Sequence, residues 1–109
     1  MPSVFEMHST VMTSSSEVTL LNLGLANTAV VRSLALTNAD TASTAAVDLF
    51  LTIGTATDPI YVHRYTQITA SETIEAMQGP LVLNGGDQLK LSGGTVDDLH
   101  VIASVLKVT

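Results

Sequence analysis

The chain has 109 residues and no cysteine, and its four basic and ten acidic side chains give a formal net charge of −6. An acidic chain without a basic stripe is a poor ligand for a phosphate backbone, so direct binding to nucleic acid is not expected. Without cysteine, no disulfide can stabilise the fold. The length fits one domain with its own core, which we expect to span residues 1–109.

The charged fraction of the sequence is low. Charged residues make up 13% of the chain, whereas a typical soluble domain has about 25%. Interface cores are depleted in charged residues, so this composition indicates a surface that other protein chains cover. A small β-sandwich that uses Ser and Thr on its outer faces would have the same composition. We favour the first interpretation, although the two are compatible.

No targeting or membrane-spanning segment is evident in the sequence. No basic segment precedes an apolar stretch, and no apolar run approaches the roughly 18 residues of a membrane span. We therefore expect a soluble protein made in the cytoplasm, with no membrane partner.

Apolar and polar residues alternate along most of the chain, and Gly, Asn, Asp and Ser interrupt the alternation. This pattern predicts an all-β fold of about eight or nine antiparallel strands, in a single β-sandwich or jelly-roll-like domain. Residues 1–3 precede the first strand without a charged side chain and are expected to form a flexible or docking arm. The expected strands cover residues 4–13, 17–25, 29–38, 46–53, 60–68, 73–78, 81–83, 88–92 and 99–108.

The alternation also assigns side chains to faces of the strands. In the first strand, Phe5, Met7 and Val11 share one face. We expect the methionines to fill the core, with an adaptable contact surface as the alternative. In residues 29–38, one shared face contains Val30, Arg32, Leu34 and Leu36.

Two later strands bear on contacts with other chains. The aliphatic ends of residues 60–68 favour burial of one face, which leaves the tyrosines outward and available to an interface. Residues 99–108 are largely apolar on both faces, which predicts a strand that is central in its sheet or covered by another subunit. The candidate interface residues are Val4, Phe5, Tyr61 and Tyr65.

The usual sets of catalytic and metal-binding residues are not recognisable in the sequence. Serine, histidine and aspartate are abundant, but the Gly-x-Ser-x-Gly motif is missing. The three histidines lie on separate predicted strands without the local spacing of zinc ligands, so structural roles are expected for His8, His63 and His100. Three aspartates in glycine-rich loops lack the alternating spacing of a calcium loop, and turn formation explains Asp87, Asp97 and Asp98. We expect no enzymatic activity, no cofactor and no metal.

Seven segments between residues 28 and 108 form an ordered set of β motifs. They are AVVRSLALTN (29–38), VDLFLT (47–52), IYV (60–62), ASETIE (70–75), GPLVL (79–83), GGDQLKL (85–91) and VIASVL (101–106). In this order they resemble small β-sandwich virion structural proteins of tailed bacteriophages, of the capsid decoration (cement) or tail-accessory type. The resemblance implies a sandwich that decorates or cements a capsid, or lines the tail or neck, and it implies no catalytic residue.

The leading functional hypothesis is therefore a bacteriophage capsid decoration protein that is made in the host cytoplasm and resides in the virion. Its expected partners are other copies of itself, as a trimer first and a dimer next, and the major capsid protein or other virion proteins. A tail, neck or fibre-attachment component is the nearest alternative. A carbohydrate-binding module is an alternative of a different class, although only Tyr61 and Tyr65 could supply a pair of aromatic faces.

Overall fold

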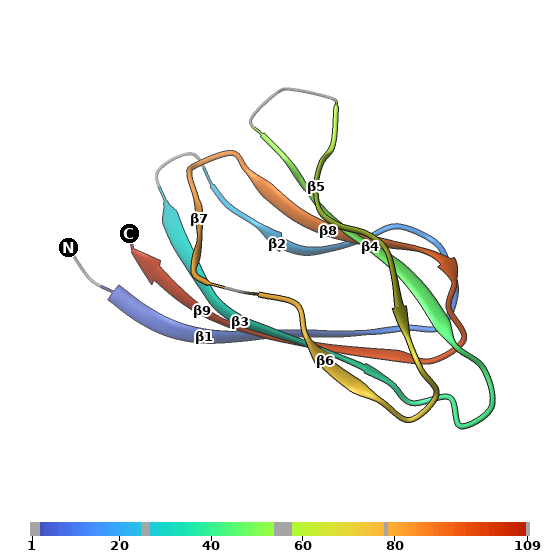
Figure 1. The fold of residues 1–109 in the computed structure, drawn as a ribbon. Coiled ribbons are helices and arrows are strands. Elements are labelled where there is room, and N and C mark those ends of the chain that lie inside the picture. The colour runs from blue at the N-terminus through green and yellow to red at the C-terminus, as the bar shows by residue number, and fades with distance from the viewer. Residues whose placement is uncertain (1–2, 25–26, 54–57, 78, 109) are drawn as a thin grey trace.

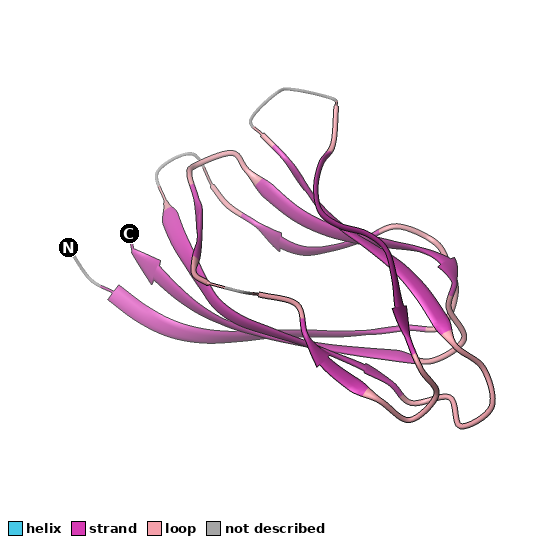
Figure 2. Ribbon diagram, in the orientation of Figure 1, coloured by secondary structure: helices cyan, strands magenta, loops and turns pink. Residues whose placement is uncertain are grey.

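The computed structural model describes residues 3–24, 27–53, 58–77 and 79–108 of the chain (Figure 1). These residues form strands, turns and loops without a helix (Figure 2), so none of them belongs to a helix that could cross a membrane. The prediction of an all-β fold with about eight or nine strands is confirmed. The strands are β1 (Ser3–Met12), β2 (Val18–Asn22), β3 (Thr28–Asn38), β4 (Ala45–Thr52), β5 (Ile60–Ile68), β6 (Thr73–Glu75), β7 (Leu81–Leu83), β8 (Gln88–Thr95) and β9 (Leu99–Val108).

The strands form two antiparallel sheets that lie as two layers (Figure 1). Sheet A has the order β1-β9-β3, and the short strands β6 and β7 both pair with the remaining edge of β3. Sheet B has the order β2-β8-β4-β5. The first and last strands are neighbours, with Ser3 opposite Val108. Of the predicted N-terminal arm, Ser3 belongs to β1, and residues 1–2 lie outside the described part of the chain.

The hydrophobic core lies between the two sheets, because each sheet turns one row of aliphatic side chains towards the other. Burial of one such side chain stabilises the fold by about 1.5–3 kcal/mol, so this layer supplies most of the driving force for folding. From sheet A the largest fully buried side chains are Met12, Val31, Leu34, Leu36, Leu83, Leu99 and Val101. From sheet B they are Val47, Leu49, Ile68, Leu89 and Leu91.

Strand β9 is central in sheet A, between β1 and β3, as its two apolar faces predict. Four of its side chains alternate into the core: Leu99, Val101, Ala103 and Val105. The intervening side chains point to the opposite, outer face, where Ile102 is exposed. The core covers the inner apolar face of β9. The outer face, with Ile102, remains exposed, so packing within this chain accounts for only one of the two apolar faces.

The prediction that one face of β3 contains Val30, Arg32, Leu34 and Leu36 is wrong for Val30 and Arg32. The register between β3 and β9 shifts between Val31 and Ser33, which inserts Arg32 as an extra residue. A bulge of this kind reverses the alternation that follows it. As a result Val31 and Leu34 are both fully buried, whereas Arg32 is exposed and Val30 is half-buried.

One buried polar side chain joins the two sheets at the end of β3. The amide nitrogen of Asn38 donates to the carbonyl oxygens of Ser43 (2.8 Å) and Ile68 (3.0 Å), and its Oδ1 accepts the N–H of Asp40 (3.1 Å). The carboxylate of Asp40 in turn accepts the N–H of Ala42, and this bond holds the pKa of Asp40 below its ordinary value. Because Asn38 is fully hydrogen-bonded, its burial costs little.

The bulge can be tested with two adjacent valines. Substitution Val31→Ala should lower the free energy of unfolding by about 2 kcal/mol, because it removes two buried methyl groups and leaves a cavity. Substitution Val30→Ala should lower it by less than about 1 kcal/mol, because Val30 remains partly solvated on the outer face. Urea denaturation followed by circular dichroism measures both values. Equal losses, or a larger loss at Val30, would contradict the bulge.

Candidate interaction surfaces

The outer face of sheet A carries a row of apolar side chains across four strands. Phe5 on β1 is opposite Leu106 on β9, Leu106 is opposite Val30 on β3, and Val30 is opposite Val82 on β7. Neighbours in such a row lie about 4.5–5.5 Å apart at Cβ, so the row is continuous. The large apolar side chains that this face leaves exposed are Phe5 (70% exposed), Met7 (70%), Val11 (54%), Val82 (57%) and Ile102 (48%).

Strand β1 directs Phe5, Met7 and Val11 outward, and apart from Val4 and the buried Met12 its inward side chains are polar. Glu6 and His8 lie on the inner side, partly buried, and contact each other at 3.1 Å between Oε1 and Nε2. Phe5, Met7 and Val11 share the outer side, as the alternation predicts. The prediction that methionine fills the core is therefore wrong for Met7. An edge strand that turns its apolar side to solvent is unusual for an isolated chain, and such patches mark interaction sites.

The outer face of sheet A is also nearly free of charge. Among the described outward side chains of β1, β3 and β9, Arg32 is the one with a permanent charge, and Glu75 adds a carboxylate at the margin of this face, on β6 opposite Ala35. Its guanidinium carbon lies 5.7 Å from the ring centroid of Phe5, within the range of a cation–π contact. An aromatic ring beside an arginine is a typical pairing in protein interfaces, where other charged residues are depleted.

The outer face of sheet B has a different character. Thr19, Lys90 and Phe50 form a row across β2, β8 and β4. Lys90 pairs with Glu17, with 3.5 Å between the ammonium nitrogen and Oε2. Phe50 is buried and its ring contacts that of Tyr61, with 5.8 Å between centroids. This row is therefore largely polar, and its buried ring, that of Phe50, is covered by Tyr61, which is itself exposed on β5.

The two candidate tyrosines lie on β5, on either side of an arginine. The guanidinium carbon of Arg64 is 4.2 Å from the ring centroid of Tyr61 and 5.1 Å from that of Tyr65. Desolvation by these neighbours lowers the pKa of Arg64, but the electrostatic effect of the tyrosines outweighs it and leaves the pKa above its ordinary value. Arg64 covers a face of each ring, so the pair does not form the open aromatic platform on which sugars stack.

Strand β5 is an irregular edge. Arg64 and Tyr65 together lie opposite Asp48 of β4, which makes a bulge, and the register shifts again beside Leu49. Tyr65 has a left-handed backbone (φ 52°), and its N–H donates to Oδ1 of Asp48 at 2.7 Å instead of to a strand carbonyl. Bulges of this kind prevent an edge strand from pairing with another chain.

The four candidate interface residues do not form one site. Phe5 and Val4 are exposed on β1, an edge of sheet A, but their side chains point to opposite faces. Tyr61 and Tyr65 are exposed on β5, an edge of sheet B. The sequence-based selection missed Val82 and Ile102, and their contribution depends on strand pairing that no single segment of the sequence reveals.

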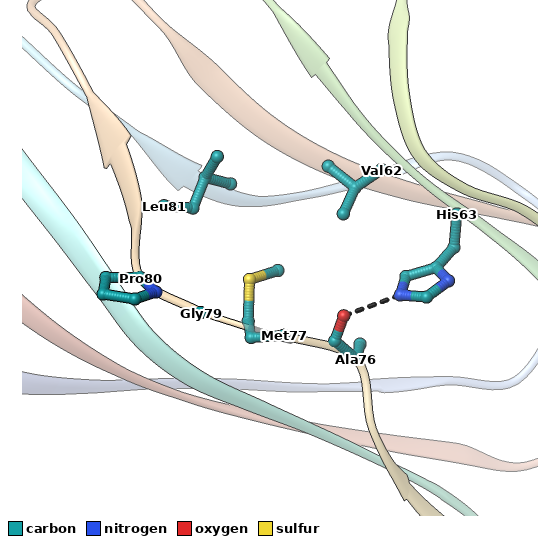
Figure 3. Close-up of a pocket in the computed structure, with 7 residues that line it drawn as sticks. All are labelled: Val62, His63, Ala76, Met77, Gly79, Pro80 and Leu81. Carbon is teal, nitrogen blue, oxygen red and sulfur yellow. Dashed lines mark hydrogen bonds between the residues drawn. The ribbon is translucent and has the colours of Figure 1, made fainter.

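A hollow of about 240 Å³ lies between β5 and the segment that joins β6 to β7 (Figure 3). His63 points across it and donates from Nε2 to the carbonyl oxygen of Ala76 at 2.6 Å. Met77 and Leu81 extend into the same space beside Val62 (Figure 3). The hollow is smaller than the roughly 300–1,000 Å³ of typical ligand sites. This hydrogen bond of His63 therefore joins β5 to Ala76, which follows β6.

The other polar candidates have structural partners. His8 contacts Glu6, and His100 contacts Asp98 at 3.1 Å. Asp87 accepts the N–H of Asn84 (2.9 Å) within the turn where Gly86 has a positive φ of 88°, a conformation that glycine adopts without strain. Within the described ranges, no three His, Asp or Glu side chains are grouped as metal ligands would be.

No protein-family model matches the chain, and no curated protein matches it significantly. Among solved structures, the chain is similar to part of one chain in a structure titled "Structure of infectious bursal disease virus Gt strain", with 12% sequence identity and a TM-score of 0.49. The similarity covers 97% of this chain and 32% of that chain, so the protein spans about a third of that neighbour's length. A likeness at this TM-score carries no functional argument.

The bond between Asp48 and Tyr65 should be measurable. Substitution Asp48→Ala leaves the N–H of Tyr65 without its carboxylate acceptor, so the free energy of unfolding should fall by about 1–2 kcal/mol. The amide of Tyr65 should also exchange with deuterium at least tenfold faster, as NMR would show. Asp58→Ala, at an exposed aspartate just before β5, serves as the matched control and should change neither value. An unchanged exchange rate at Tyr65 in Asp48→Ala would refute the role of this bond.

Proposed function

We propose that the chain is a structural protein of a tailed-bacteriophage particle and, more specifically, a capsid decoration or cement protein. The observation that carries this proposal is the apolar, nearly uncharged outer face of sheet A. The row of Phe5, Leu106, Val30 and Val82 gives this face a width of four strands. The link to phage particles comes from the ordered β motifs of the sequence, and the surface supplies the physical means of attachment.

The proposed mechanism needs only surface burial. Each apolar Å² removed from water contributes about 25 cal/mol, less the entropy lost on docking. A copy that bridges neighbouring capsid subunits binds the intact shell and not the ruptured one, so it stabilises the shell by linkage. Repetition over many copies turns a modest contact into a large total. The protein itself performs no catalytic step in this mechanism.

Arg32 gives the proposed contact its orientation. A single guanidinium within an apolar face is best satisfied by a carboxylate or carbonyl oxygen on the partner, because an unpaired buried charge is costly. Its contact with Phe5 holds it on this face before docking. The major capsid protein is thus expected to present an apolar patch with one acceptor group to each copy. A tail or neck protein with the same chemistry would make this chain a tail component instead.

The test uses purified particles of the phage that encodes the chain, prepared without this protein. Adding the protein back should give saturable binding in a sedimentation assay and should raise the temperature of genome release, measured with a DNA-binding dye. Substitution Ile102→Asp should weaken binding at least tenfold, because it places a carboxylate in the apolar face. Thr19→Asp, on the polar outer face of sheet B, is the matched control and should bind normally.

Three outcomes would count against the proposal. Absence of the chain from purified particles would exclude a virion role. Binding with no change in release temperature would exclude cementing, and binding confined to tails would assign the chain to the tail. Equal effects of Ile102→Asp and Thr19→Asp, with both variants folded by circular dichroism, would show that the outer face of sheet A is not the docking surface.

A further inference from the structure

Strand β1 is a long and regular sheet edge. It pairs with β9 over ten consecutive residues without a register shift, and its other edge has no partner among the described residues. Its sequence, SVFEMHSTVM, contains no proline, glycine or lysine, which are the residues that usually protect an exposed edge. The backbone N–H and C=O groups along this edge are therefore available to pair with another strand.

The other described edges are protected. β5 carries the bulge at Arg64 and Tyr65 and a second register shift. β6 and β7 have three residues each. β2 has five residues with a register shift next to Leu21, and it lies beside β1 across the sandwich. Short and bulged edges are usual devices against edge pairing, and β1 is neither short nor bulged.

We propose that β1 pairs with β1 of a second copy of this chain, antiparallel and about a two-fold axis that passes next to Met7. Sheet A then continues through the axis as one sheet from β3 of one copy to β3 of the other. Identical strands can close in this way because a two-fold interface is self-complementary. The inference concerns self-association and does not depend on the proposed role in a virion.

The side chains of β1 select this register. Opposite residues in an antiparallel pair point to the same face, so a two-fold register must place either an outward or an inward residue at the axis. With Met7 at the axis, Glu6 of each copy is opposite His8 of the other, an acceptor opposite a donor. With Glu6 or His8 at the axis, identical polar groups meet instead, and like charges in that position are destabilising. The Met7 register is therefore preferred.

The same register joins the apolar outer faces of the two copies. Met7 meets Met7, and Phe5 of each copy lies diagonally next to Met7 of the other, within reach of a long side chain. The flexible thioether of methionine adapts to such a contact. The exposed apolar side of β1, which the core does not use, thus becomes the middle of a wider apolar surface. The expectation from the sequence is a trimer first and a dimer next, whereas pairing of β1 with β1 produces a dimer.

The register can be tested by disulfide cross-linking, because the chain contains no cysteine. Met7→Cys places two thiols at the axis, where opposite Cβ atoms are close enough for a disulfide. Val11→Cys is the matched control, since Val11 is exposed on the same face of the same strand but lies four residues from the axis. Under mild oxidation, Met7→Cys should become a covalent dimer and Val11→Cys should stay monomeric on a denaturing gel.

A second pair of variants tests the charge complementarity without new cysteines. His8→Glu places carboxylates opposite each other on both sides of the axis and should raise the dimer dissociation constant about tenfold in sedimentation equilibrium. The double variant Glu6→Lys with His8→Glu restores opposite charges and should return the constant to within about threefold of the parent. Circular dichroism confirms that both variants are folded.

The parent chain should sediment at twice the mass of one chain at micromolar concentration. A monomer at all concentrations up to the high micromolar range would overturn the proposal and leave the edge to a different protein. A stable trimer would overturn it as well. Equal cross-linking of Met7→Cys and Val11→Cys, or failure of the double variant to restore association, would reject the register.

Discussion

A single extra residue in β3 determines which side chains of sheet A enter the core. Without the bulge at Arg32, Val31 and Leu34 would point to opposite faces and could not both be buried in the core. Because β3 pairs with β9, β6 and β7, its alternation of inward and outward side chains must match that of all three neighbouring strands. The same bulge directs Arg32 outward onto Phe5, so the core and the candidate docking face have a common origin.

Sheet A is apolar on both sides, and the two sides have different roles. Its inner side packs against sheet B, and this packing accounts for the stability of the sandwich. Its outer side, with Phe5, Met7 and Ile102, contributes nothing to that packing and is exposed to water. The outer side of sheet B is more polar, because Lys90 pairs there with Glu17 and the buried ring of Phe50 is covered by Tyr61.

Period-two patterning was sufficient to predict the fold class and the common face of Phe5, Met7 and Val11, and it gave the central position of β9 as one of two alternatives. The bulges at Arg32 and Tyr65 were not predictable, because each depends on the strand that lies opposite it and not on local sequence. The outward orientation of the apolar face of β1 was equally unpredictable, because an apolar face is normally assigned to the core. The outer row of sheet A joins residues that are up to about a hundred positions apart in the chain, so only pairing brings them together.

The bulged edge of β5 has a further consequence for how far assembly can proceed. A sandwich with complementary edges at both ends can add copies without limit and grow into filaments, as happens when a heterologous contact does not close. Here the bulge at Arg64 and Tyr65 distorts the edge of β5, and the far edge of sheet A consists of the three-residue strands β6 and β7, so β1 is the one long and regular edge among the described strands. Under the proposed pairing of β1 with β1, association along sheet A would therefore stop at two copies.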